Sequence, residues 1–159
     1  MKNLANSGEK EITLSEIIQY AINQEIEAAA LYNRLRSSTS DPRAQELFRK
    51  LEEMEIEHRR NLENFDLQGF TDHPEEEYVD FRLTDYMVEV PPQKELDFQQ
   101  ALILAAKRED RTRALYEKMA AHFAMAPDVQ EMFAILAREE GRHKHLIEDL
   151  YDRIIHERS

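Results

Sequence analysis

One pattern of acidic, aromatic and imidazole residues is written twice in this chain of 159 residues. Each copy consists of a Glu, a Tyr seven residues later, and a Glu-x-x-His motif further along the chain. The two copies are Glu25, Tyr32, Glu55 and His58, and then Glu109, Tyr116, Glu140 and His143. Corresponding residues are 84 positions apart for the first two members and 85 for the last two. Chance is a poor explanation of such a register, and the pattern divides the chain into two similar halves.

The composition favours an all-α protein. The chain contains only three Gly and five Pro, no Trp, and many Ala, Leu, Glu, Arg and Gln, which are good helix formers. Short turns separate the first predicted helix from the second and the third from the fourth, so each pair is expected to form an antiparallel hairpin. The four predicted helices run from the capping box at Thr13-Leu14-Ser15-Glu16 to about Ser37, from Ser40-Asp41-Pro42 to about Phe65, from near Asp97 to about Phe123, and from Pro127 to about His156.

The segment between the two hairpins, about 66–96, is too long for a tight turn and too apolar for a free linker. We expect a long crossover packed along the bundle, with a short helix after Pro74. Residues 1–10 are polar and lack the apolar core of a signal sequence, and residues up to about 12 are expected to form a flexible tail. The length of the chain suits one domain spanning 1–159.

Each predicted helix carries an apolar stripe with alternating spacings of four and three residues. In the second helix the stripe reads Ala44, Phe48, Leu51, Glu55, His58, Leu62 and Phe65. All four Glu and both His of the repeated pattern fall in such stripes, which predicts that they face the core. An ionised carboxylate is costly to bury unless it is paired, and like charges raise each other's pKa. One or two polar residues could set the helix register, but six at matched positions favour a pair of bound cations.

The turns place the paired residues at the same height in the bundle. Ser40 lies halfway between Glu25 and Glu55, and the midpoint between Glu109 and Glu140 falls just before Pro127. Because both arms of a hairpin rise by about 1.5 Å per residue, the two Glu of each hairpin should lie side by side. Oxygen-rich sites with one imidazole for each ion suit iron or manganese, and zinc can occupy them too. We therefore predict two metal ions, with iron as the expected metal.

These motifs resemble those of the ferritin-like superfamily, and most closely those of rubrerythrin-type proteins. The resemblance covers nearly the whole chain outside the crossover and the tail. It implies a ferritin-like four-helix bundle built from two hairpins, with Glu25 and Glu109 as terminal ligands and Glu55 and Glu140 as bridging ligands. His58 and His143 would bind one ion each. Tyr32 and Tyr116 would hydrogen-bond to ligands, although core packing alone would also explain two buried tyrosines.

Three departures from the related families bear on the reaction. The chain has no Cys, so the resemblance implies that electrons come from a separate donor such as a rubredoxin-like protein. Rubrerythrins with full peroxidase activity carry an extra Glu three residues after the ligand of the third helix, where this chain has Thr112. Bacterioferritin has a haem-binding Met directly after the Glu of the second helix, where this chain has Ile56, so no haem is expected.

Charge and hydropathy exclude several classes of partner. The net charge is −12, which argues against binding to nucleic acid or to an anionic membrane surface. No run of residues is long and apolar enough to cross a membrane, and the absence of Cys excludes disulfides. A cytoplasmic protein that forms a homodimer or a higher homo-oligomer is expected. Residues expected at the surface are Glu57, Glu139, His73, His122, His145, His156, Arg111 and Arg113.

Three functions are compatible with these features. The first is a non-haem di-iron oxidoreductase that reduces peroxide or oxygen, with no catalytic residue beyond the metal ligands. The second is oxidation of ferrous iron for storage or handling. The third is a helical interaction module with a structural metal site, which six intact ligands make the weakest of the three. Ala28 and Thr112 are small residues beside the ligands and would leave room for a small oxidant.

Overall fold

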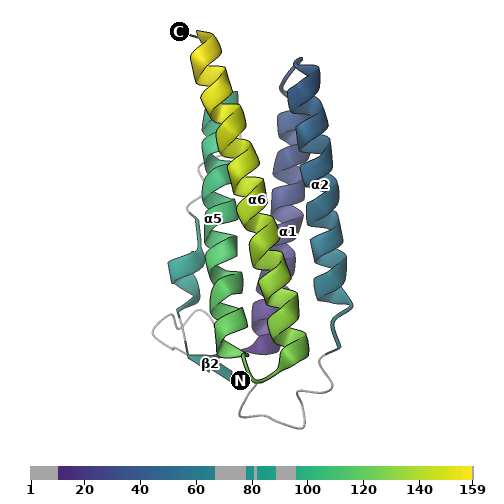
Figure 1. Cartoon of the computed structure of the whole chain (residues 1–159), viewed down its shortest axis with the longest axis vertical. Helices are drawn as coiled ribbons and strands as arrows, with labels where there is room; N and C mark the ends of the chain where they lie inside the picture. Colours follow the sequence, from purple (N-terminus) through teal and green to yellow (C-terminus); the bar gives the residue numbers. More distant parts are fainter. Residues whose placement is uncertain (1–10, 67–77, 81, 89–95, 159) are drawn as a thin grey trace.

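The computed structural model describes residues 11–66, 78–80, 82–88 and 96–158. Four long helices form a bundle and confirm the all-α fold (Figure 1). They are α1 (Leu14–Ser37), α2 (Pro42–Glu63), α5 (Phe98–His122) and α6 (Pro127–Arg158). The predicted ends are correct to within two residues, the largest differences being that α2 ends at Glu63 and that α6 continues to Arg158.

Side-chain caps fix the helix starts. The Thr13 hydroxyl accepts the backbone N–H of Glu16 at 3.0 Å, and the Glu16 carboxylate accepts the backbone N–H of Thr13, which completes the predicted capping box. Asp41 caps α2, with Pro42 at the first helical position. Caps of this kind satisfy backbone donors that the helix itself leaves unpaired.

The core is arranged as two hydrophobic clusters, one toward each end of the bundle. Both α1 with α2 and α5 with α6 pack along their length, whereas contacts between the hairpins are fewer. One cluster includes Leu14, Ile17, Met119 and Phe133, and the other includes Leu35, Phe48, Leu102 and Ile147. The repeated Glu and His residues lie at heights between these clusters, so apolar side chains cover them from above and below.

A small sheet was not predicted. Strand β1 (Glu11–Thr13) pairs antiparallel with β2 (Tyr78–Asp80), with Ile12 opposite Val79. The pair joins the end of the expected tail to the crossover, where Ile12 is buried against the first cluster. The crossover also forms the 3₁₀ helix η1 (Leu83–Tyr86), which contacts α5. The residues directly after Pro74, where a short helix was expected, lie outside the described residues.

Gly141 has a packing role in the second hairpin. A Cβ atom at this position would lie 3.2 Å from Cδ of Arg113, so the absence of a side chain on α6 makes room for the Arg113 chain on α5. The equivalent positions of the first hairpin hold Ile56 and Ala29. The first hairpin thus has the larger residue, Ile56, at the position of Gly141, and the smaller residue, Ala29, at the position of Arg113. Gly in a helix interior costs about 1 kcal/mol relative to Ala, and the approach of Arg113 is a packing reason for Gly at this position.

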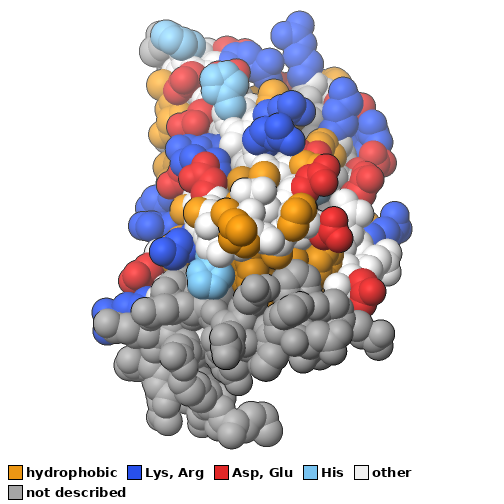
Figure 2. Space-filling view, turned by 60° about the horizontal axis from the view of Figure 1, so that its bottom comes forward, with side chains coloured by type: hydrophobic (Ala, Val, Ile, Leu, Met, Phe, Trp, Pro, Cys, Tyr) orange, Lys and Arg blue, Asp and Glu red, His pale blue; other side chains and the backbone are white. Residues whose placement is uncertain are grey.

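The surface mixes charges of both signs. Figure 2 shows basic and acidic side chains interspersed over one face of the bundle, with hydrophobic side chains between them. Ion pairs along single helices contribute to this pattern, as between Arg49 and Glu46 and between Arg59 and Glu63. Within the described ranges, no helix is sufficiently long and apolar to span a bilayer.

Candidate metal centre

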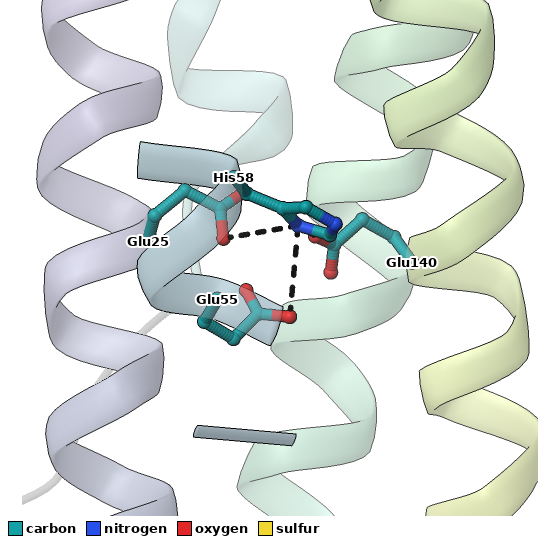
Figure 3. Close-up of side chains that lie close together, drawn as sticks. All are labelled: Glu25, Glu55, His58 and Glu140. Atoms are coloured by element: carbon teal, nitrogen blue, oxygen red, sulfur yellow. Dashed lines mark hydrogen bonds and ion pairs between the residues drawn. The ribbon is translucent and has the colours of Figure 1, made fainter. Parts of the chain in front are cut away.

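The bundle brings all six predicted ligands together at mid-height. Each helix contributes one Glu, and α2 and α6 each add a His one turn further along. Every one of the six side chains is at most 2% exposed. Four of them are drawn in Figure 3, where side chains from α1, α2 and α6 point toward one another. The equal heights expected from the positions of the turns thus agree with the arrangement in space.

The six residues form two overlapping sets of possible ligands. Within each set the ligand atoms lie within 4.8 Å of one another. Both sets contain Glu55 and Glu140. The sets are Glu25, Glu55, His58 and Glu140, and Glu55, Glu109, Glu140 and His143. Carboxylates that belong to both ligand sets are expected where these groups bridge a pair of ions.

The two imidazoles face the centre through the same ring nitrogen. Nδ1 of His58 lies 2.7 Å from Oε1 of Glu140 and 3.6 Å from Oε2 of Glu25 (Figure 3). Nδ1 of His143 lies 2.6 Å from Oε1 of Glu55 and 3.7 Å from Oε2 of Glu109. The two rings stack with centroids 5.6 Å apart. The contacts of one half are therefore repeated in the other, with the roles of the two hairpins exchanged.

Several buried atoms of the cluster have no hydrogen-bond partner among the described residues. They include Oε2 of Glu25, Oε1 of Glu55, Oε2 of Glu109 and Nδ1 of His143. Glu55 and His143 are close enough to form a hydrogen bond but are not aligned for one. Leaving buried polar atoms unsatisfied costs about 1–3 kcal/mol each, and more for charged groups. Lone pairs that converge without pairing fit coordination to cations, so the residues present suit a pair of metal ions.

The electrostatics of the centre also favour bound cations. Burial, and after it the charges of Glu109 and Glu25, raise the pKa of both Glu55 and Glu140 well above the ordinary range. Burial and mutual repulsion thus oppose the ionisation of these two carboxyls in the absence of cations. Cations would compete with protons and remove the repulsion among the carboxylates. Carboxylate oxygens with one imidazole per position match the preferences of iron and manganese, and zinc also accepts them.

The two tyrosines tie each hairpin to a carboxylate of the other. The Tyr116 hydroxyl of α5 donates to Oε1 of Glu25 on α1 at 2.5 Å, and Tyr32 of α1 donates to Oε1 of Glu109 on α5. Both side chains are fully buried, so they are core aromatics and hydrogen-bond donors at once. Burial and the neighbouring carboxylates raise the pKa of both phenols, which keeps their protons available for donation.

Glu139 corrects one expectation from the sequence. It was expected at the surface, yet its carboxylate contacts Nε2 of His58, and its side chain is only 30% exposed. Successive residues of a helix point about 100° apart, so the residue before a member of the apolar stripe lies beside the stripe. On α6 this direction faces α2. Arg108, which precedes Glu109, was missed for the same reason: it is buried and donates to Glu27 of α1 at 2.9 Å.

The remaining expectations concern residues around the centre. Glu57, His122, His145, His156 and Arg111 are exposed, as expected. Arg113 is partly buried, where it pairs with Asp110 and Glu117. His73 lies outside the described residues. Ala28 is buried and Thr112 is partly buried, one turn along α1 and α5 from the Glu residues.

Comparison with known proteins gives one match. The sequence model of the rubrerythrin family matches residues 6–99, which is more than half of the chain. The matched range contains α1 and α2 with Glu25, Glu55 and His58, whereas the second copy of the pattern lies beyond it. No curated protein and no solved structure is significantly similar to the chain.

Proposed function

We propose that this chain, which belongs to the rubrerythrin family, is a non-haem di-iron oxidoreductase that reduces peroxide or oxygen with electrons from a separate donor. One observation carries the proposal: two buried ligand sets share Glu55 and Glu140, so two ions would be held next to each other. Family membership suggests a di-iron oxidoreductase, and the choice of oxidant and donor is the proposal made here.

Iron bound at this centre would supply two electrons to a small oxidant by passing from the ferrous to the ferric state. The protein contributes positions and surroundings. Glu25 and Glu109 are held in orientation by the tyrosine hydroxyls of the opposite hairpin. The hydrophobic clusters above and below exclude bulk water, which strengthens electrostatic interactions inside the site. Ala28 and Thr112 are small residues one turn from the Glu residues of α1 and α5, and we expect a small oxidant to reach the ligands beside them.

Oxidation of ferrous iron for storage or handling is the second candidate. Thr112 favours it, because rubrerythrin-type peroxidases carry an extra carboxylate at this position. Under this alternative, iron is the substrate as well as the cofactor, and ferric product accumulates without an electron donor. A structural role for the ions would give neither reduction of an oxidant nor accumulation of ferric product.

Anaerobic loading with ferrous iron tests the metal-binding part of the proposal. Elemental analysis should find two iron ions per chain, and replacing both Glu55 and Glu140 by Ala should abolish binding of the pair. The matched control is Glu57→Ala, which changes an exposed carboxylate on the same turn of α2. Unchanged stoichiometry in the double variant would show that the ligands are elsewhere.

Stopped-flow mixing of the ferrous protein with peroxide and with oxygen then ranks the oxidants. An increase in ferric absorption with either oxidant is expected, followed by return to the ferrous form when a rubredoxin-like donor is added. Accumulation of ferric iron beyond two ions per chain, with no response to the donor, would favour iron handling. No ferric signal with either oxidant would exclude both redox functions.

A further inference from the structure

The two histidines of the centre differ on the side that faces away from it. His58 and His143 both turn Nδ1 toward the carboxylates, and both are almost completely buried. The outer nitrogen Nε2 of His58 contacts the carboxylate of Glu139. The outer nitrogen of His143 is buried and has no hydrogen-bond partner among the described residues. The twofold similarity of the ligands therefore does not extend to the groups behind them.

The sequence explains this difference. Glu139 directly precedes Glu140 on α6, and the residue that directly precedes Glu55 on α2 is Met54. These positions are 85 residues apart, the same separation as between the two Glu-x-x-His motifs. The Met thioether is only a weak acceptor, whereas a carboxylate accepts strongly from an imidazole N–H. One half of the repeat thus carries an acceptor that the other half lacks.

A neutral imidazole has one N–H donor and one lone pair, and it binds a metal only through the lone pair. An acceptor at Nε2 holds the proton there and leaves the lone pair of Nδ1 directed at the ligand set. It also fixes the rotation of the ring and makes the ligating nitrogen more basic. Loss of such a partner typically weakens metal binding by about 10- to 100-fold.

We propose that Glu139 is a positioning residue for His58, and that it makes the two metal positions unequal, with the one at His58 binding its ion more tightly. The inference rests on the metal-binding part of the proposed function. Glu139 acts through His58 and does not itself belong to either ligand set. Since its side chain is 30% exposed, its charge keeps contact with solvent. The partly exposed carboxylate therefore avoids most of the cost that full burial would bring.

Titration of the metal-free full chain with Co²⁺ tests the proposal. Wild type should bind two ions in two steps whose affinities differ by about 10-fold or more. Glu139→Ala should weaken the tighter step by about 10- to 100-fold and leave the weaker step unchanged. Glu139→Gln should retain most of the tighter step, because its amide oxygen can still accept from Nε2. A merely structural role of Glu139 would shift both steps together.

Two further variants assign the steps. His58→Ala should remove the tighter step, and His143→Ala should remove the weaker one. Met54→Gln introduces an acceptor of similar size at the position equivalent to Glu139 in the repeat, and it should tighten the weaker step. Glu57→Ala is the matched control on an exposed position and should leave both steps unchanged.

The tautomer gives an independent readout. In the metal-free protein, at a pH where the imidazoles are neutral, ¹⁵N NMR should show the proton of His58 on Nε2 in wild type and a mixture of the two tautomers in Glu139→Ala. A proton on Nδ1 of His58, equal weakening of both steps in Glu139→Ala, or no weakening at all would overturn the inference while leaving the metal centre in place. Wild type that binds fewer than two ions would overturn the proposed function and this inference together.

Discussion

Replacing Glu55 by Gln in the metal-free protein should stabilise the fold. Glu55 is 1% exposed and lies among three other carboxylates. Burial, and then the charges of Glu109 and Glu25, raise its pKa well above the ordinary value of 4.5. Gln has nearly the same shape and carries no charge, so it removes the repulsion and can donate to its neighbours. Each unit by which burial and repulsion raise the pKa of a carboxyl corresponds to about 1.4 kcal/mol of stability lost at a pH where the unfolded chain is ionised, so a gain of this order is expected.

The sign of the pH dependence follows from the direction of this pKa shift. Between pH 4.5 and the raised pKa of Glu55, the folded state binds more protons than the unfolded state. The stability of wild type therefore falls as the pH rises through this window, because stability rises with pH only where the unfolded state binds more protons. The advantage of Glu55→Gln should therefore grow as the pH rises from 4.5 toward the raised pKa and should be lost as the pH falls below 4.5.

Urea unfolding in the presence of a chelator measures this difference, with equal m values in both proteins as the sign of an unchanged unfolding reaction. In a chain of this size each kcal/mol also moves the midpoint of thermal unfolding by about 2–4 °C. Glu57→Gln, on an exposed position of α2, is the matched control and should change little. Metal-free Glu55→Gln that is less stable than wild type at neutral pH would refute the reasoning.

Adding metal should reverse the order of stability. An ion that binds only the folded state stabilises it by about 2.7 kcal/mol at a concentration one hundred times its Kd. Wild type gains this stabilisation at two positions, and Glu55→Gln loses a carboxylate shared by both. A variant that gained as much from Co²⁺ as wild type would show that Glu55 is not a ligand. The carboxylate that binds the ions is thus expected to lower the stability of the metal-free fold.

Three further predictions concern the surroundings of the centre. Tyr116→Phe removes a buried hydrogen bond to the carboxylate of Glu25 and should cost about 1.5–3 kcal/mol in urea unfolding of the metal-free protein; an unchanged midpoint would contradict this bond. Gly141→Ala should stabilise α6 by about 1 kcal/mol in an Arg113→Ala background and by less in wild type, as a double-mutant cycle would measure; equal effects would refute the packing role of Gly141. Phe48→Ala should cost about 3–5 kcal/mol in the same assay, because its ring is completely buried in the core; a loss below 1 kcal/mol would contradict this packing.

The helices and the six clustered residues could be predicted because they follow from local rules. Apolar spacing defines one face of each helix, capping residues define its start, and turn positions set the relative height of the two arms. Glu139 and Arg108 could not be found in this way, because the apolar stripe describes only the helix face that points toward the core. A residue beside the stripe is buried only if a neighbouring helix covers it, and this covering depends on how the two hairpins pack together.

The β1–β2 pair shows a second limit. Glu11–Thr13 and Tyr78–Asp80 are each three residues long, too short for a periodic pattern to be distinctive. Their pairing depends on where the crossover passes the start of α1, which no local signal in either segment contains. The role of Gly141 was hidden for a similar reason, since it depends on the path of the Arg113 side chain from the adjacent helix.

The hydroxyls of Tyr32 and Tyr116, which cross between the hairpins, have a consequence for folding kinetics. Each hairpin can form from residues close in sequence, whereas the centre needs both hairpins in place. If docking of the hairpins completes after the transition state, interactions at the centre slow unfolding and leave the folding rate unchanged. Bound metal would then act as a clasp: it would lengthen the lifetime of the folded protein without making the protein fold any faster.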